Sequence, residues 1–183
     1  MYFSLAFLLS GLALVSPVLS EVCKGQVTLS EYYIGVDKNV KVETVSCPEI
    51  SHAKRSDLSS RQASGATNVC GAECDTSCFT PSGGGPDPNE CHVIADALRY
   101  DSENTGTYFD VNNGTAGDNI VVMTYNSCET FFANQADGVL EYCRTDWASV
   151  IDWVAPNCQS TQNAHGGDCI ASDQTWFIQV QHS

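Results

Sequence analysis

Ten cysteines in a chain of 183 residues set the first limit on how this protein can fold. They follow an N-terminal run, MYFSLAFLLSGLALVSPVLS, that has no charged side chain and ends in a proline and small residues. Such a run is typical of a secretory signal peptide, which we assign to residues 1–20. In an exported chain an even number of cysteines indicates a disulfide framework, so we predict a secreted, extracellular protein.

All ten cysteines are predicted to form disulfides. Their spacing leaves most of the pairing open. One pair is suggested by its surroundings, because two strand-like runs separated by the turn DKN lie between Cys23 and Cys47 and predict a β-hairpin closed by one bridge. The other predicted disulfide cysteines are Cys70, Cys74, Cys78, Cys91, Cys128, Cys143, Cys158 and Cys169.

A polar stretch, PEISHAKRSDLSSRQASGATN, follows the hairpin and is typical of a linker. It contains the dibasic pair Lys54-Arg55, where a secretory-pathway convertase could cut, so residues 21–55 are either a permanent hairpin or a pro-segment. Two cysteines precede this pair and eight follow it, so each piece could close its own bridges. We therefore divide the mature chain into residues 21–55, a linker over 56–69 and an α/β domain over 70–183.

Helix and strand patterns follow one another after Cys70. CGAECDTSC is expected to be an irregular, disulfide-stapled segment. Asp87 as N-cap, Pro88 as first residue and Glu90 as capping-box partner predict a helix start. A second helix is expected with Thr145 as its N-cap and Pro156 at its end. Strands are expected in GTYFDV, NIVVMTY, SCETFFANQ, GDCIA and TWFIQVQ. The pattern predicts an α+β fold: a small disulfide-stapled α/β sandwich whose antiparallel sheet carries two main helices, preceded by the short N-terminal β-hairpin.

Charge divides the chain unevenly. Residues 21–55 balance five bases against five acids, whereas residues 56–183 hold three arginines and seventeen acids and contain no lysine. Such a surface repels phosphate, so nucleic acids and anionic membranes are unfavourable partners. After the signal peptide no run is long and apolar enough for a membrane span, and we expect no membrane insertion.

The second predicted helix has a tryptophan outside its core stripe. Trp147, Val150, Ile151 and Val154 recur at helical spacing and should be buried. Trp153 points about 120° away from that stripe, onto a polar ridge where an indole could stack on a sugar ring. The loop CQSTQNAHGGDC comes next and offers neutral hydrogen-bonding groups. The candidate glycan-binding residues on the ridge and the loop are Asp146, Ser149, Trp153, Gln162, Asn163 and His165.

The sequence gives little support to catalysis or metal binding. His92 and Asp96 lie one turn apart on a helix flank, which favours a solvated pair over a catalytic dyad. No zinc-type ligand spacing and no GxSxG serine elbow occur, although seventeen acids leave a glycosidase open. We therefore predict no enzyme, no cofactor and no metal. The sequon Asn113-Gly114-Thr115 predicts N-glycosylation.

Several long motifs carry a resemblance to a known family. In one order along the chain, GGGPDPNECHVIADALRYDS, CETFFANQ, EYCRTDWASVIDW and NCQSTQNAHGGDCIASDQTWFIQVQHS resemble the secreted glycan-binding proteins of mushrooms typified by the inky-cap protein called Y-three. The resemblance covers roughly residues 70–183 and leaves out the hairpin. It implies a cysteine-stapled α/β sandwich that binds a fucosylated GalNAc-GlcNAc type glycan, on cell surfaces or glycoproteins, without catalysis. Such a protein would serve in defence or cell recognition.

A second resemblance supports a different class. Small secreted fungal killer toxins and necrosis-inducing effectors are also similar, as disulfide-stapled sandwiches with DC or EC opening a helix. A protein of that class would act on a membrane or channel of a target cell. Neither resemblance fixes the oligomeric state, and a homodimer stays open.

Overall fold

The computed structural model describes residues 22–47, 65–114 and 117–183. The signal peptide assigned to residues 1–20, the dibasic pair Lys54-Arg55 and residues 56–64 of the expected linker lie outside these ranges. Within them no helix is both long and apolar enough to cross a membrane.

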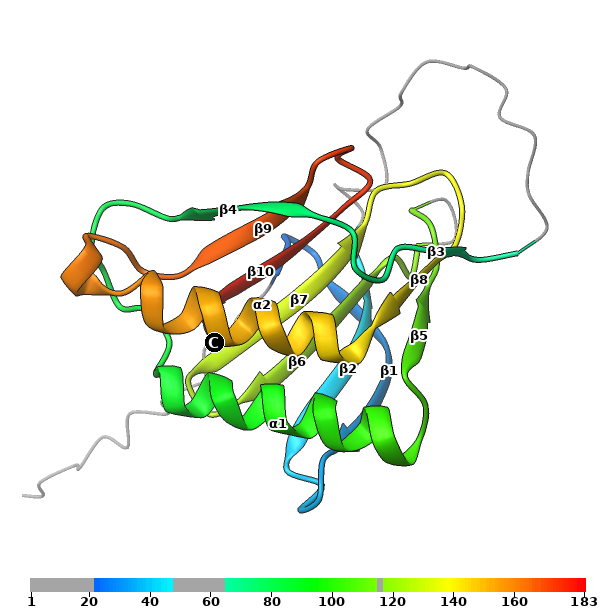
Figure 1. Ribbon diagram of the computed structural model, residues 1–183, viewed down its shortest axis with the longest axis horizontal. Coiled ribbons are helices and arrows are strands. Elements are labelled where there is room, and N and C mark those ends of the chain that lie inside the picture. The colour runs from blue at the N-terminus through cyan, green and yellow to red at the C-terminus, as the bar shows by residue number, and fades with distance from the viewer. Residues whose placement is uncertain (1–21, 48–64, 115–116) are drawn as a thin grey trace, which may run out of the picture.

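A seven-stranded antiparallel sheet forms the body of the protein (Figure 1). Its order is β1-β2-β6-β7-β10-β9-β4, so strands from both ends of the chain meet in one layer. The strands are β1 (Val27–Ile34), β2 (Val40–Ser46), β4 (Cys74–Cys78), β6 (Ile120–Tyr125), β7 (Cys128–Asn134), β9 (Gly167–Ala171) and β10 (Trp176–His182). A small second sheet has the order β3-β8-β5, from β3 (Thr67–Asn68), β8 (Leu140–Cys143) and β5 (Tyr108–Val111).

Two helices, α1 (Pro88–Asn104) and α2 (Arg144–Asn157), lie side by side on one face of the large sheet (Figure 1). A short 3₁₀ helix, η1 (Ser160–Gln162), follows α2. This arrangement confirms the predicted α+β sandwich with an antiparallel sheet and two main helices.

The main core lies between the helices and the sheet, and aromatic rings fill its centre. The rings of Phe132 and Trp176 stack with centroids 5.5 Å apart, and Tyr142 lies 4.9 Å from each of them. Trp147 of α2 is fully buried, and its indole N–H donates to Thr130 Oγ1 at 2.9 Å. A buried indole N–H needs such an acceptor, so this bond fixes α2 against β7.

The N-terminal hairpin belongs to the same sheet as the rest of the chain. The Cys23–Cys47 disulfide closes it as predicted, but β2 also pairs with β6 from Lys41 to Val45. Val40 and Val42 are fully buried in the main core. The division at residues 55 and 70 therefore does not separate two folded units, because the hairpin supplies two of the seven strands.

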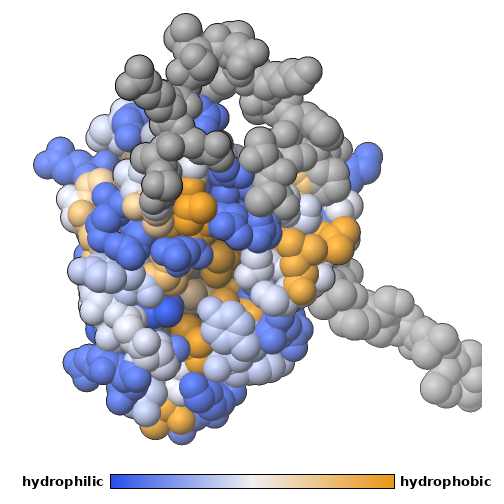
Figure 2. Space-filling model, turned by 90° about the vertical axis from the view of Figure 1, so that its right-hand side faces the viewer, coloured by the Kyte–Doolittle hydropathy of each residue, from blue (hydrophilic) through white to orange (hydrophobic). Residues whose placement is uncertain are grey.

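β1 forms one edge of the large sheet. Four of its apolar or aromatic side chains are exposed, namely Val27, Leu29, Tyr32 and Tyr33. Figure 2 shows the right-hand side of the molecule as drawn in Figure 1, where apolar surface occurs as separate patches between hydrophilic residues. An unpaired strand edge can accept another strand, so a homodimer stays a prediction.

Three local expectations need correction. Glu90 does not close a capping box: its carboxylate accepts hydrogen bonds from the side chain and backbone of Ser127, while Asp87 alone caps α1. The second helix begins at Arg144 with Cys143 rather than Thr145 as its N-cap, and it runs one residue past Pro156. Residues 74–78, expected to be irregular, form β4 because they pair with β9.

Five disulfides join all ten cysteines. The eight cysteines after residue 55 pair among themselves. Three of their bridges attach the segment 70–78 to the rest of the domain, as Cys70–Cys143, Cys74–Cys169 and Cys78–Cys158. The fifth bridge, Cys91–Cys128, ties α1 to β7. Long loops closed in this way lower the entropy of the unfolded chain.

Candidate functional site

One ridge of α2 carries the side chains predicted to meet a sugar. Asp146, Ser149 and Trp153 recur at spacings of three and four, so they line one side of the helix. The amide of Asn157, one turn further on, donates to the Trp153 carbonyl at 2.7 Å. The Asp146 end of the ridge lies beside the chain that leads into β4, because Asp146 Oδ2 accepts from Gly71 N at 2.7 Å.

Trp153 is the most exposed aromatic group of α2. Its side chain is 47% exposed, whereas that of Trp147, six residues earlier, is fully buried. The helical spacing predicts this difference, since Trp147, Ile151 and Val154 of the predicted core stripe are buried. The fourth residue of that stripe, Val150, is only half-buried. An indole held on a helix and open to solvent can stack on the C–H face of a sugar.

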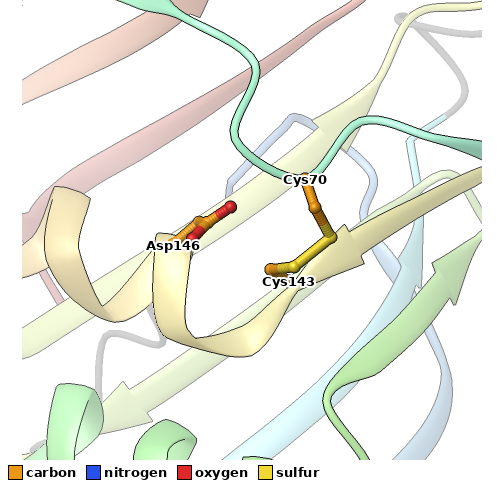
Figure 3. A group of neighbouring side chains, drawn as sticks. All are labelled: Cys70, Cys143 and Asp146. Carbon is orange, nitrogen blue, oxygen red and sulfur yellow. A yellow bond between two sulfur atoms is a disulfide. The ribbon is translucent and has the colours of Figure 1, made fainter.

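Asp146 belongs to the ridge and also holds a neighbouring chain segment through a hydrogen bond. Within the described residues one group of side chains places metal-binding atom types together: Cys70, Cys143 and Asp146 (Figure 3). Both sulfurs belong to one disulfide, so neither is the thiolate that a metal ion would need. The Asp146 carboxylate instead holds Gly71 beside this bridge.

The loop after α2 packs against the segment 79–86. Asn163 Oδ1 accepts from Ser82 N at 3.0 Å, and His165 Nδ1 donates to the Pro81 carbonyl at 2.7 Å. Gln162 Oε1 accepts from Gln159 N and Thr161 Oγ1. The three loop residues expected to face a ligand therefore use part of their hydrogen-bonding capacity inside the protein.

One polar group of each loop residue has no partner among these contacts. They are the Nδ2 amide of Asn163, the Nε2 amide of Gln162 and the Nε2 ring nitrogen of His165. With its proton on Nδ1, neutral His165 offers Nε2 as an acceptor. The loop thus combines two amide donors and one acceptor, all held by internal contacts.

A separate charged cluster joins the two helices. Asp152 of α2 lies 2.8 Å from His92 and also contacts Arg99, both of α1. Asp96 adds further ion pairs with His92 at 3.5 Å and with Arg99 at 3.1 Å. The expected His92–Asp96 pair is thus part of a network of four charged residues that form ion pairs with one another.

The predicted glycosylation site lies at the far end of the small sheet. Asn113 borders a cavity of about 320 Å³ with Asp110 and Asp137. Its amide donates to the Asp137 carbonyl at 2.6 Å, and an N-linked glycan would leave one N–H on this nitrogen. Thr115 of the sequon lies outside the described residues, so glycosylation stays a prediction.

Comparison of the chain with models of protein families found no match, and comparison with curated proteins found none either. The class that the fold defines is therefore structural: a disulfide-stapled α+β sandwich with a helical face. The resemblance to mushroom glycan-binding proteins stays an expectation.

Sequence reasoning found the exposed ridge but missed some of its surroundings. Asn157 follows Trp153 by one turn, so the same helical spacing would have placed it on the ridge. The contact between Asp146 and Gly71 joins residues that are 75 positions apart. No local pattern in the sequence carries a signal for such a contact.

Proposed function

We propose that this protein is a secreted, non-enzymatic glycan-binding protein whose α2 ridge meets the sugar, with a fucosylated GalNAc-GlcNAc type glycan as the expected ligand. The exposed indole of Trp153, set among hydroxyl and amide groups on a rigid helix, is the observation that carries the proposal. A flat apolar ring beside polar groups suits a sugar, which has a C–H face and a rim of hydroxyls.

The loop residues extend this binding surface. The ridge leads toward the C-terminal end of α2, where the loop 158–165 begins, and the Cys78–Cys158 bridge fixes this junction. The groups left unpartnered on Gln162, Asn163 and His165 would bond sugar hydroxyls. Because the loop is already held by internal bonds, little entropy would be lost on binding.

The positions of the charged groups support the non-enzymatic part of the proposal. The His92–Asp152 pair lies in a network of ion pairs between two helices rather than beside a nucleophile. The reactive form of cysteine is a thiolate, and all ten cysteines are oxidised. Recognition asks only for hydrogen bonds and a stacking ring, which the ridge and loop supply.

A glycan array probed with the whole mature protein tests the function. The hairpin must be kept, since β2 is paired with β6 in the sheet. We expect binding to structures that contain fucosylated GalNAc-GlcNAc. Trp153→Ala should weaken it by roughly 1–3 kcal/mol, the scale of losing a stacked aromatic anchor. Tyr100→Ala is the matched control, because Tyr100 is an exposed aromatic residue on the other helix.

The alternative classes give different results in the same set of experiments. A killer-toxin-like protein or necrosis-inducing effector would leave the array silent and change ion flux in cells stripped of surface glycans. A glycosidase would release sugar from the glycans that it binds. Equal glycan binding by Trp153→Ala and the parent protein would support the glycan-binding function but show that the ridge is not the binding site.

A further inference from the structure

A second cavity lies beside the segment that Asp146 holds. It has a volume of about 320 Å³ and opens between the chain that enters β4 and the turn that joins β9 to β10. This volume falls at the lower end of the range of about 300–1,000 Å³ that is usual for ligand pockets. The lining residues are Val69, Ala72, Glu73, Ala171, Ser172, Asp173 and Trp176.

Trp176 lines this cavity and carries an indole donor without a partner in the described residues. Its side chain is 1% exposed and lines the cavity, yet its indole N–H donates to no group of the described residues. The fully enclosed side-chain atoms without a partner are Asp118 Oδ1 and Asn119 Oδ1, so the indole nitrogen reaches open space. In contrast, the N–H of buried Trp147 is bonded to Thr130. An indole N–H that keeps contact with open space and has no acceptor among the described residues can donate to a ligand oxygen in place of water.

Two carboxylates supply acceptors at the rim. Glu73 is exposed and makes no side-chain hydrogen bond or ion pair with the described residues. Asp173 accepts from the hydroxyl and the backbone N–H of Thr175 through Oδ1, which leaves Oδ2 free. These bonds lower the pKa of Asp173, so its carboxylate is ionised at neutral pH. The floor between the acids is apolar, from Val69, Ala72 and Ala171.

The walls of the cavity are fixed in place. The segment 69–73 is anchored by the Cys70–Cys143 bridge, by the Gly71–Asp146 hydrogen bond and by the Cys74–Cys169 bridge just beyond its end. On the opposite wall Gln174 N bonds to Ala171 O at 2.8 Å and closes the β9–β10 turn. A site whose walls are already ordered loses little entropy when a ligand binds.

The chemistry of the lining selects among ligand classes. An anion is repelled by Glu73 and Asp173, and an ammonium group cannot accept a hydrogen bond from the Trp176 N–H. A neutral ligand with hydroxyl groups is not repelled by the carboxylates. Each hydroxyl can donate a hydrogen bond to a carboxylate and accept one from the indole N–H.

We propose that this cavity is a subsite for one neutral sugar unit, whose hydroxyls accept from Trp176 Nε1 and donate to Glu73 and Asp173. The inference rests on the proposed glycan-binding function. It adds a site separate from the Trp153 ridge.

Indole proton resonances of the whole mature protein test the subsite directly. The chain has three tryptophans, so Trp147, Trp153 and Trp176 give three indole N–H signals. The probes are the methyl glycosides of fucose, N-acetylgalactosamine and N-acetylglucosamine, added separately at millimolar concentration. We expect at least one of them to shift the Trp176 signal, while the Trp147 signal stays in place because its N–H is already bonded.

Charge-neutral variants of the rim test the acceptors. Glu73→Gln and Asp173→Asn keep the size of each side chain, and the asparagine can still accept from Thr175. Each should weaken the sugar titration by about tenfold, the scale of one hydrogen bond to a charged group. Asp137→Asn, at the other cavity, is the control and should leave the titration unchanged.

The outcomes separate the subsite from the function. A shift of Trp176 that weakens in both rim variants supports the subsite. Array binding with a shift of Trp153 alone, or of no indole, overturns the subsite and leaves the glycan-binding function standing. A silent array together with unmoved indole signals overturns both proposals. A Trp176 shift caused by tetramethylammonium and by none of the sugars overturns the assigned ligand class.

Discussion

The Nδ1 atom of His92 lies 2.8 Å from Oδ1 of Asp152 and joins the two helices that cover the sheet. Asp152 also contacts Arg99, so one carboxylate of α2 bonds two cationic groups of α1. The hydrogen bond to Asp152 raises the pKa of His92 above its usual 6.5. Burial acts to raise the pKa of Asp152, but the bonds from His92 and Arg99 outweigh it and leave this pKa below 3.8.

The signs of these shifts predict how stability depends on pH. The raised pKa of His92 gives a contribution that is complete below pH 6.5 and is lost as the pH rises through the folded-state value. The lowered pKa of Asp152 gives a contribution that is present above pH 3.8 and is lost as the pH falls through its folded-state value. Both contributions are therefore present between these two pH values.

Urea unfolding from acid to mildly alkaline pH measures the effect. We expect the free energy of unfolding of the parent protein, relative to His92→Gln, to decrease above pH 6.5 by at most about 1 kcal/mol, because His92 is largely exposed. Asp110→Asn, an acid outside the cluster, should follow the parent curve. A constant difference between His92→Gln and the parent from pH 5 to pH 9 would contradict this linkage.

Trp147 should matter for stability far more than Trp153. Trp147→Ala removes a fully buried indole and leaves the Thr130 hydroxyl without its donor, so the free energy of unfolding should fall by roughly 3–5 kcal/mol. Trp153→Ala removes a half-exposed ring and should change it by less than about 0.5 kcal/mol. Denaturant unfolding of the oxidised protein compares the two variants. Unfolding of the Trp153 variant under native conditions would place that residue in the core.

Local patterns predicted much of the fold. Asp87 and Pro88 start α1 as expected, and the alternation of Trp176, Ile178 and Val180 against their neighbours produces β10. Short polar strands escaped prediction, because β4 exists through its pairing with β9 rather than through its own composition. The pairing of β2 with β6 could not be predicted either, since β6 lies more than 70 residues further along the chain.

The candidate site divides in the same way. Helical periodicity was enough to place Trp153 outside the core. The loop contacts were not predictable, because Asn163 and His165 bond to residues more than 80 positions earlier. The cavity under Trp176 combines Glu73 with Asp173, which are brought together only when β4 joins the edge of the sheet.

Asn134 joins the end of β7 to two other chain segments. It is fully buried, and its amide nitrogen lies within 3.0 Å of the carbonyls of Val111, Asn112 and Gly138. Asn134→Asp would remove these donors and place a carboxylate against carbonyl oxygens, so unfolding should become easier by about 3–5 kcal/mol. Gln135→Glu makes the same chemical change at the exposed neighbouring position. Similar denaturation midpoints for the two variants would show that the Asn134 hydrogen bonds do not stabilise the fold.

The hairpin should stay with the protein whether or not the chain is cut after Arg55. Its disulfide joins Cys23 to Cys47 and thus links the hairpin only to itself. The pairing of β2 with β6 and the burial of Val42 would hold a cleaved hairpin without a covalent bond. Native mass spectrometry of the secreted protein should include residues 21–55, and a denaturing spectrum shows whether the chain is cut. A native mass without the hairpin would mean that the other five strands are stable alone.

Gly167 should be irreplaceable because three elements meet at its α-carbon. A Cβ atom there would lie 2.4 Å from the Ser77 carbonyl oxygen of β4 and 3.0 Å from the Cys158 sulfur. Gly167→Ala must therefore push β4 away from β9 or open the Cys78–Cys158 bridge, and either change should cost about 3 kcal/mol or more. Gly84→Ala is the matched control, because a Cβ there meets no atom within 4 Å. Secreted yield and peptide mapping of the disulfides measure the outcome: we expect the Gly167 variant to be poorly secreted with Cys78 and Cys158 partly unpaired. A well-secreted Gly167→Ala protein with native bridges would show that β4 can move without loss of the fold.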